Sequence, residues 1–139
     1  MALHGFLVRR LELEEEMSRT ALVVDDSPTM RQMVALTLTS AGFLVVEAEH
    51  GKDAVAKVVG GPKMDIIVTD LNMPEMDGIS LIRELRKMAA FKFTPILMLT
   101  TESAPDKKQA GKEAGATGWI VKPFNPELML KVIAKLLPS

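Results

Sequence analysis

Residues 65–78 read DIIVTDLNMPEMDG, an apolar run followed by an acid and then by a segment rich in turn-forming residues. Ile66, Ile67 and Val68 are consecutive and do not alternate with polar residues, which is typical of a strand covered on both faces, as in a parallel sheet. Asp70 ends that strand, and Asp77-Gly78 precedes the next helical pattern. This stretch therefore predicts a strand that carries a carboxylate to the edge of a parallel sheet.

Similar units lie on both sides of this stretch. Ser27-Pro28 predicts a helix start, because serine caps a helix and proline suits its first position. Five strand–helix alternations predict an α/β domain with right-handed crossovers. The predicted strands are 21–24, 43–47, 65–69, 95–99 and 118–121, and the predicted helices are 28–41, 52–60, 78–90, 105–115 and 126–137.

Composition excludes several classes of protein. A chain of 139 residues is long enough for one domain, and its net charge of −1 argues against general binding to nucleic acid. The absence of cysteine excludes disulfides, thiolate nucleophiles and cysteine-ligated metals. No apolar run approaches the ~20 residues of a membrane span, and residues 1–10 lack a secretory pattern. We therefore expect a cytoplasmic protein that binds neither nucleic acid nor membrane.

The chain divides into a leader, residues 1–18, and a domain, residues 19–139. Two arginines and four glutamates give the leader a net charge of −2, and Leu3, Phe6, Leu7 and Leu11 lie on one stripe of a short helix. An alternative interpretation is that Met17 is the natural start. A purine-rich ribosome-binding site, if translated by mistake, would read as consecutive glutamates just before the true initiating methionine. Both interpretations remain open.

Chemistry-bearing residues recur where the strands end. Ligands of open parallel sheets bind at the carboxyl edge, where Asp25, Asp26, Asp70, Thr100 and Lys122 are expected to meet. Each residue alone suits an ordinary turn or a solvated charge. Three crowded carboxylates, however, repel one another unless a cation is present, and Mg²⁺ prefers such oxygen ligands. A soft transition-metal site is disfavoured, because neither histidine lies near these strand ends.

Short motifs surround these strand ends, and their order and spacing are specific. Asp70 lies 44 residues after Asp26 and 30 residues before Thr100, and Lys122 lies 22 residues after Thr100. The motifs are Val23-Val24-Asp25-Asp26-Ser27, Met30-Arg31, residues 69–78, Leu99-Thr100-Thr101-Glu102 and Val121-Lys122-Pro123-Phe124. On these motifs the chain resembles the receiver domain of two-component response regulators, most closely the single-domain chemotaxis type. The resemblance implies a flavodoxin-like (βα)5 three-layer sandwich with strand order 2-1-3-4-5.

The resemblance also implies roles for the residues at the strand ends. Asp70 is the expected phosphoacceptor, assisted by Thr100 and Lys122. Mg²⁺, or Mn²⁺ as a substitute, is expected on Asp26, Asp70 and the Asn72 carbonyl, with Asp25 acting through a water. The domain is thus expected to be a signalling phosphoacceptor rather than an enzyme, although it assists its own phosphorylation and dephosphorylation.

Further positions carry supporting roles in the family. Trp119 stands where the family has an aromatic rotamer switch, usually tyrosine in chemotaxis members; the alternative is a half-buried aromatic residue on an edge strand. Asn72 and Glu102 are expected to tune hydrolysis of the phosphoryl group. Pro74 and Gly78 shape the loop after the acceptor, and a cis bond before Pro123 aims Lys122 at the site.

The expected output is a surface rather than a second domain. The resemblance places it on the fourth helix, fifth strand and fifth helix, at about residues 104–137. Expected partners are a sensor histidine kinase and a flagellar motor switch protein or a phosphatase, with the chain a monomer or weak dimer. The alternative is a relay that passes phosphate to a histidine phosphotransfer protein. A phosphoester hydrolase is disfavoured, because Asn72 stands where a second acid is needed, and no phosphate-binding P-loop motif is present.

Overall fold

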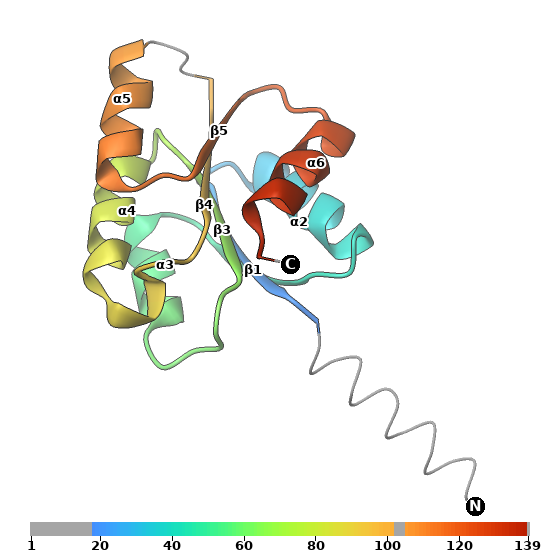
Figure 1. The fold of residues 1–139 in the computed structure, drawn as a ribbon, viewed down its shortest axis with the longest axis horizontal. Helices are drawn as coiled ribbons and strands as arrows, with labels where there is room; N and C mark the ends of the chain where they lie inside the picture. The colour runs from blue at the N-terminus through green and yellow to red at the C-terminus, as the bar shows by residue number, and fades with distance from the viewer. Residues whose placement is uncertain (1–17, 102–104, 139) are drawn as a thin grey trace, which may run out of the picture.

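The computed structural model describes residues 18–101 and 105–138, which form one five-stranded sheet flanked by helices (Figure 1). The predicted leader therefore lies almost wholly outside the described residues. The strands are β1 (Thr20–Val24), β2 (Leu44–Ala48), β3 (Ile66–Asp70), β4 (Ile96–Thr100) and β5 (Gly118–Val121). The helices are α2 (Pro28–Ser40), α3 (Gly51–Val58), α4 (Gly78–Lys87), α5 (Pro105–Ala114) and α6 (Pro126–Leu136), with a 3₁₀ turn at Ala89–Phe91.

The sheet is parallel throughout, and its strand order β2-β1-β3-β4-β5 confirms the predicted flavodoxin-like fold. Helices α2 and α6 cover one face, and α3, α4 and α5 cover the other (Figure 1). The order reverses between β1 and β3, because the chain adds β2 on one side of β1 and then adds β3, β4 and β5 on the other. In such folds the crevice at this reversal, outside the carboxyl ends of the strands, is where ligands bind.

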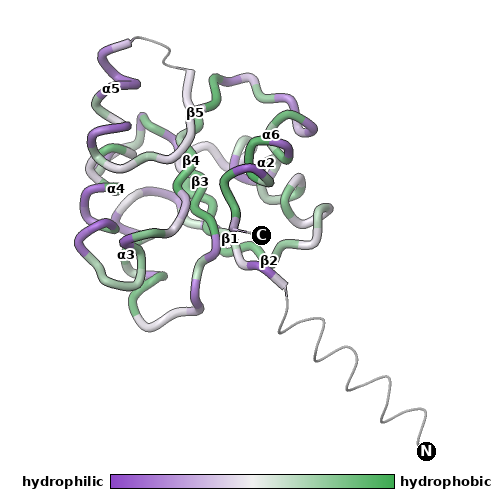
Figure 2. The backbone as a smooth tube through the Cα atoms, viewed as in Figure 1, coloured by the Kyte–Doolittle hydropathy of each residue, from purple (hydrophilic) through white to green (hydrophobic). Residues whose placement is uncertain are grey.

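The continuous apolar runs explain the layering. Every residue of β3 and of β4 is buried, as expected for strands covered by helices on both faces. Figure 2 shows these central strands coloured largely as hydrophobic. The edge strand β2 is different: only Ala48 is buried there, and Leu44 is 46% exposed.

Polar side chains cap the N-termini of the two helices that follow β1 and β3. The Ser27 hydroxyl accepts the Met30 N–H at 3.3 Å, with Pro28 in the first turn, which confirms the predicted helix start. Asp77 caps α4 through the N–H of Ser80 at 2.8 Å. The loops that leave β1 and β3 are thereby tied to rigid helices.

The structure shifts several predicted boundaries. Strands β2, β3 and β4 each begin and end one residue later than predicted, so Asp70 and Thr100 are the final residues of their strands. The helix predicted at 78–90 ends at Lys87, because Met88 is extended (φ −85°, ψ 129°) and a separate 3₁₀ turn follows. None of the helices within 18–101 and 105–138 has the length and apolar character needed to cross a membrane.

Candidate functional site

Three carboxylates meet at the carboxyl edge of the sheet. Asp25 and Asp26 directly follow β1, and Asp70 ends β3, the neighbouring strand. One carboxylate oxygen from each of the three lies within 4.8 Å of the others. Asp25 and Asp70 are buried, at 2% and 7% exposed, whereas Asp26 faces solvent. The structure thus brings together the three acids that the sequence predicted would converge.

Lys122 reaches the same cluster from the end of β5. Its Nζ lies 3.0 Å from Oδ2 of Asp25 and 3.3 Å from Oδ1 of Asp70. Its side chain is only 11% exposed, so both ion pairs are shielded from water. The backbone anchors the lysine as well, because the Lys122 N–H donates to the Thr100 carbonyl at 2.7 Å. The Lys122–Pro123 peptide bond is cis, as the resemblance implied.

Burial raises the pKa of the Asp70 carboxyl above its ordinary value, and the negative charge of Asp25 raises it further. The Lys122 ammonium and the Leu71 N–H, which donates to Asp70 Oδ1 at 2.9 Å, act in the opposite direction without outweighing burial. Among the described residues, the three clustered carboxylates share one ammonium group, that of Lys122. An additional cation near Asp25 and Asp70 would favour the ionised form of Asp70.

The donor set suits a hard divalent cation. The clustered ligand atoms are all carboxylate oxygens, and neither sulfur nor imidazole takes part. Mg²⁺ takes a few carboxylate oxygens and completes its octahedral shell with water or phosphate oxygens, which fits one exposed and two buried acids. Asn72, whose carbonyl was predicted as a further ligand, is exposed in the loop that follows Asp70.

Thr100 stands one strand away from the acids. It is fully buried at the end of β4, directly after Leu99, the residue paired with Asp70 in the parallel register. Thr100 therefore ends its strand at the same edge of the sheet as the acids. Glu102, predicted to flank the pocket, lies outside the described residues, as does Ala104 on the predicted output surface.

The loop between β3 and α4 is closed at its base. The Gly78 N–H donates to the Leu71 carbonyl at 2.8 Å. A Cβ at position 78 would stand 2.3 Å from the carbonyl oxygen of Asp70, so only glycine fits there. Within the loop, Pro74 is exposed and Glu75 has a φ of +66°. Pro74 thus lies within this loop, and Gly78 lies at its end as the first residue of α4.

Trp119 is partly buried on the edge strand β5, as the alternative interpretation described it. Its indole Nε1 is buried and has no hydrogen-bond partner within the described residues. The ring packs toward α5, where a Cβ at Gly111 would lie 2.9 Å from Cζ3. The pairing of Gly111 with Trp119 is a contact that the sequence analysis did not anticipate, since the two residues meet only in the folded chain.

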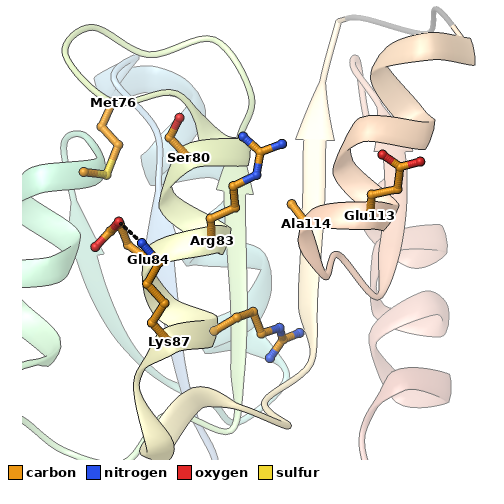
Figure 3. Close-up of a pocket in the computed structure, with 8 residues that line it drawn as sticks. Met76, Ser80, Arg83, Glu84, Lys87, Glu113 and Ala114 are labelled. Atoms are coloured by element: carbon orange, nitrogen blue, oxygen red, sulfur yellow. Dashed lines mark hydrogen bonds and ion pairs between the residues drawn. The ribbon is translucent and has the colours of Figure 1, made fainter.

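A separate pocket of about 470 Å³ lies between α4 and α5 (Figure 3). Its wall carries no member of the acidic cluster. The Glu84–Lys87 ion pair of 3.1 Å spans one turn of α4 at its rim. The residues shown in Figure 3 include Ser80 and Arg83 of α4, and Glu113 and Ala114 of α5. This pocket offers neither the clustered acids nor the buried lysine that mark the sheet edge.

Two arginines carry contacts for which the sequence analysis gave no role. Arg31 donates from Nη1 to the Asp25 carbonyl at 2.8 Å and from Nε to Glu47 at 3.2 Å. Arg86 donates to three carbonyls, those of Phe91, Thr94 and Gly115, at 2.6–3.3 Å. The motif Met30-Arg31 was visible in the sequence, but its contacts depend on the fold.

Known proteins resemble this chain over most of its length. The family model of the response regulator receiver domain matches residues 21–134. Chemotaxis protein CheY1 of Helicobacter pylori is 40% identical over 117 residues, which span 84% of this chain and 94% of that protein. The chemotaxis protein CheY homolog of Campylobacter jejuni is 38% identical over 84% of this chain and 90% of its own length.

Solved structures agree with the curated relatives. The chemotaxis protein CheY4 of Vibrio cholerae superposes with a TM-score of 0.83 at 50% identity, covering 86% of this chain and 99% of that one. The receiver domain of the sensor histidine kinase PA1611 from Pseudomonas aeruginosa, which holds a magnesium ion in its active-site cleft, gives a TM-score of 0.80 at 25% identity, covering 88% and 99%. The match over residues 21–134, the strand order and the identities to chemotaxis proteins together show that this chain belongs to the response regulator receiver family, within its CheY-like chemotaxis branch.

Proposed function

We propose that Asp70 receives a phosphoryl group from a sensor histidine kinase, and that the phosphorylated domain controls a partner in chemotaxis from the cytoplasm. The observation that carries the proposal is the meeting of three acids and a buried lysine at one sheet edge. As a receiver domain of a response regulator, the protein is a signalling phosphoacceptor. What is proposed is the residue that accepts phosphate, the ion that assists it and the surface that reads the result.

The proposed chemistry is one displacement at phosphorus. A carboxylate oxygen of Asp70 attacks the phosphorus of a phosphohistidine, the P–N bond breaks, and the imidazole nitrogen leaves with the bonding electron pair. The product is an acyl phosphate on Asp70. Such transfers need little covalent chemistry from the protein, so positioning and charge neutralisation supply most of the acceleration.

Lys122 and Thr100 are proposed to receive the transferred group. The Lys122 ammonium already lies 3.3 Å from Asp70, where it is placed to neutralise charge on a phosphoryl oxygen. Thr100, at the end of the neighbouring strand, is proposed to donate its hydroxyl to a second phosphoryl oxygen. Asn72 and Glu102 are proposed to orient the water that later hydrolyses the acyl phosphate.

The acidic cluster is proposed to hold Mg²⁺, with Mn²⁺ as a substitute. Asp26, Asp70 and the Asn72 carbonyl would bind it directly, and Asp25 would bind through a water. When bound, the ion supplies positive charge to the transferring oxygens. The geometry supports this assignment, because one carboxylate oxygen from each of Asp25, Asp26 and Asp70 lies within 4.8 Å of the others.

The proposed output surface comprises α5, β5 and α6. A groove of about 370 Å³ lies between α5 and β5 on this surface. It has a cationic rim and an aromatic wall, and the residues that carry these properties are Lys108, Lys112 and Trp119. Sparse packing by Ala110 and Ala114 is proposed to let α5 move when Asp70 is phosphorylated. The proposed target is a flagellar motor switch protein or a phosphatase.

The first test is intact mass spectrometry after mixing the protein with acetyl phosphate and Mg²⁺. We expect one phosphoryl adduct, which disappears in Asp70→Asn and in a sample treated with a chelator. An adduct that persists in Asp70→Asn would overturn the assignment of the acceptor. The decay of the adduct then separates the two outputs: rapid loss supports a switch, whereas a durable adduct that transfers to a histidine phosphotransfer protein supports the relay alternative.

A further inference from the structure

Arg31 holds the peptide group that joins two acids of the cluster. Its Nη1 donates to the carbonyl oxygen of Asp25 at 2.8 Å, and its Nε faces Oε1 of Glu47 on β2 at 3.2 Å. The Arg31 side chain is 13% exposed, compared with 43% for Glu47. A charge-assisted hydrogen bond that is largely shielded from water is among the stronger contacts that a carbonyl receives.

The carbonyl that Arg31 binds belongs to the peptide bond between Asp25 and Asp26. Because this bond is planar, fixing its oxygen also fixes the direction in which the chain leaves Asp25 and the position of the Asp26 Cα. The Asp25 N–H donates to the Ala48 carbonyl at 3.2 Å, and the Ser27 N–H donates to Oδ1 of Asp25 at 2.9 Å. The loop is thus anchored on both sides of the peptide group that Arg31 holds.

Asp26 depends on this anchoring more than the other two acids do. Asp25 and Asp70 are buried, and Lys122 holds both carboxylates. Within residues 18–101 and 105–138, no hydrogen bond or ion pair ends on the carboxylate of Asp26, which faces solvent. Its approach to the other acids is therefore set by the backbone from which it projects.

Arg31 bonds to no carboxylate of the cluster in the structure. Its partners are a main-chain carbonyl and Glu47, so it does not neutralise the acids through an ion pair. Glu47 is held in turn, since Nζ of Lys57 donates to its carbonyl at 2.6 Å. The chain of contacts from β2 through the guanidinium to the loop links the edge of the sheet with the proposed cation site.

We infer that Arg31 is a positioning residue for the cation: by tying the Asp25 carbonyl to Glu47, it keeps the Asp26 carboxylate within reach of an ion shared with Asp25 and Asp70. The inference rests on the proposed function. Groups that orient metal ligands from outside the coordination shell typically contribute 10–100-fold to metal affinity. The same range is expected for Arg31.

The experiment measures Mg²⁺ affinity in the full chain without any phosphodonor. The rise in unfolding temperature with Mg²⁺ concentration yields an apparent Kd, because a ligand that binds only the folded state stabilises it. We expect Arg31→Met to weaken the Kd at least tenfold. Arg31→Lys, which retains one donor, should lie in between, and Glu47→Gln should weaken the Kd by a smaller factor.

The matched control is Arg83→Met, which removes an exposed arginine from α4 with no hydrogen bond to the cluster. Its Kd should equal that of the wild type. A second readout is the rate of modification by acetyl phosphate: in Arg31→Met it should require more Mg²⁺ for half-saturation and recover when Mg²⁺ saturates. A purely structural role would lower the unfolding temperature without changing the Mg²⁺ dependence.

The outcomes separate the inference from the proposed function. If the wild type is neither stabilised by Mg²⁺ nor modified, the proposed function fails. If the wild type responds and Arg31→Met folds with an unchanged Kd, the inference is overturned while the function stands. Should Arg31→Met fail to fold, unchanged affinities in Arg31→Lys and Glu47→Gln would overturn the inference equally.

Discussion

A methyl group added at Gly111 would stand 2.9 Å from Cζ3 of the Trp119 indole, closer than neighbouring side chains pack. The glycine lies in α5, and the tryptophan lies on β5, the last strand of the sheet. The lack of a side chain at position 111 therefore lets a large ring lie under the helix. Any movement of α5 against β5 must change the surroundings of this ring.

Gly111→Ala is expected to displace the indole. Alanine favours the helix by roughly 0.5–1 kcal/mol, whereas forcing a methyl group into a filled space costs about 1–3 kcal/mol, so the free energy of unfolding should fall slightly. The emission of the single tryptophan should shift to longer wavelength as the ring becomes more exposed. Fluorescence and chemical denaturation measure both effects.

The control for this prediction is the same substitution in a Trp119→Phe background. The smaller ring leaves space for the methyl group, so Gly111→Ala should then stabilise the protein by up to about 1 kcal/mol. If both backgrounds respond equally in chemical denaturation followed by circular dichroism, the two residues are not coupled in the way that their contact suggests.

Asp70→Asn should be more stable than the wild type at neutral pH. The pKa of Asp70 is raised in the folded state, so ionisation of this carboxyl costs stability. The cost is absent below the ordinary value of 3.8, grows as pH rises towards the folded pKa, and is complete above it. The stability difference between variant and wild type should therefore vanish near pH 3 and grow as the pH rises above 3.8.

Magnesium should reverse that order. At a hundredfold excess over its Kd, Mg²⁺ would stabilise the wild type by about 2.7 kcal/mol, and it would stabilise Asp70→Asn much less because one ligand is neutral. Thermal unfolding with and without Mg²⁺ measures this difference. Equal stabilisation of both proteins would place the ion away from Asp70.

Lys122→Met should separate transfer from cation binding. The ammonium contacts Asp25 and Asp70 but is itself a cation, so its removal should leave Mg²⁺ stabilisation intact or stronger. The rate of modification by acetyl phosphate should fall about 10²–10³-fold, because one charge facing the phosphoryl oxygens is lost. Loss of both properties would mean instead that Lys122 arranges the acids.

Arg86→Met should destabilise the fold by about 2–4 kcal/mol, since it leaves three partly buried carbonyls without their donor. Gly115 fits this arrangement: its φ is +117°, and a Cβ there would lie 2.9 Å from Nε of Arg86. Arg83→Met, on the exposed side of the same helix, should change stability by less than about 0.5 kcal/mol. Urea denaturation compares the two variants, and equal losses would show that Arg86 is no anchor.

Hydrophobic periodicity and the order of motifs along the chain predict the strands, the helices and the residues that meet at the sheet edge. Apolar runs predicted the five strands of the sheet, and the residues at the strand ends identified the acids and Lys122. The resemblance to the family supplied the strand order, which periodicity alone does not give. The roles of individual site residues stay predictions until the variants are measured.

What sequence reasoning missed depends on contacts between distant segments. Ala89 and Ala90 are good helix formers, so the helical pattern extended the third predicted helix to residue 90. In the fold, Arg86 binds the carbonyls of Phe91 and Thr94, and the chain turns away after Lys87. The contacts of Arg31 and Gly111 were invisible for the same reason, since their partners lie on other elements.

The closed base of the loop after β3 has a consequence for how mutational scans of this protein should be interpreted. Gly78 carries no chemical group, yet any side chain there would press on the main chain of Asp70 itself. In a screen that selects for phosphorylation, substitutions of Gly78 would therefore be as damaging as substitutions of the acids and the lysine. Gly78 itself, however, would contact neither the phosphodonor nor the ion. At this position, sensitivity to substitution would mean that the backbone of Asp70 leaves no space for a side chain.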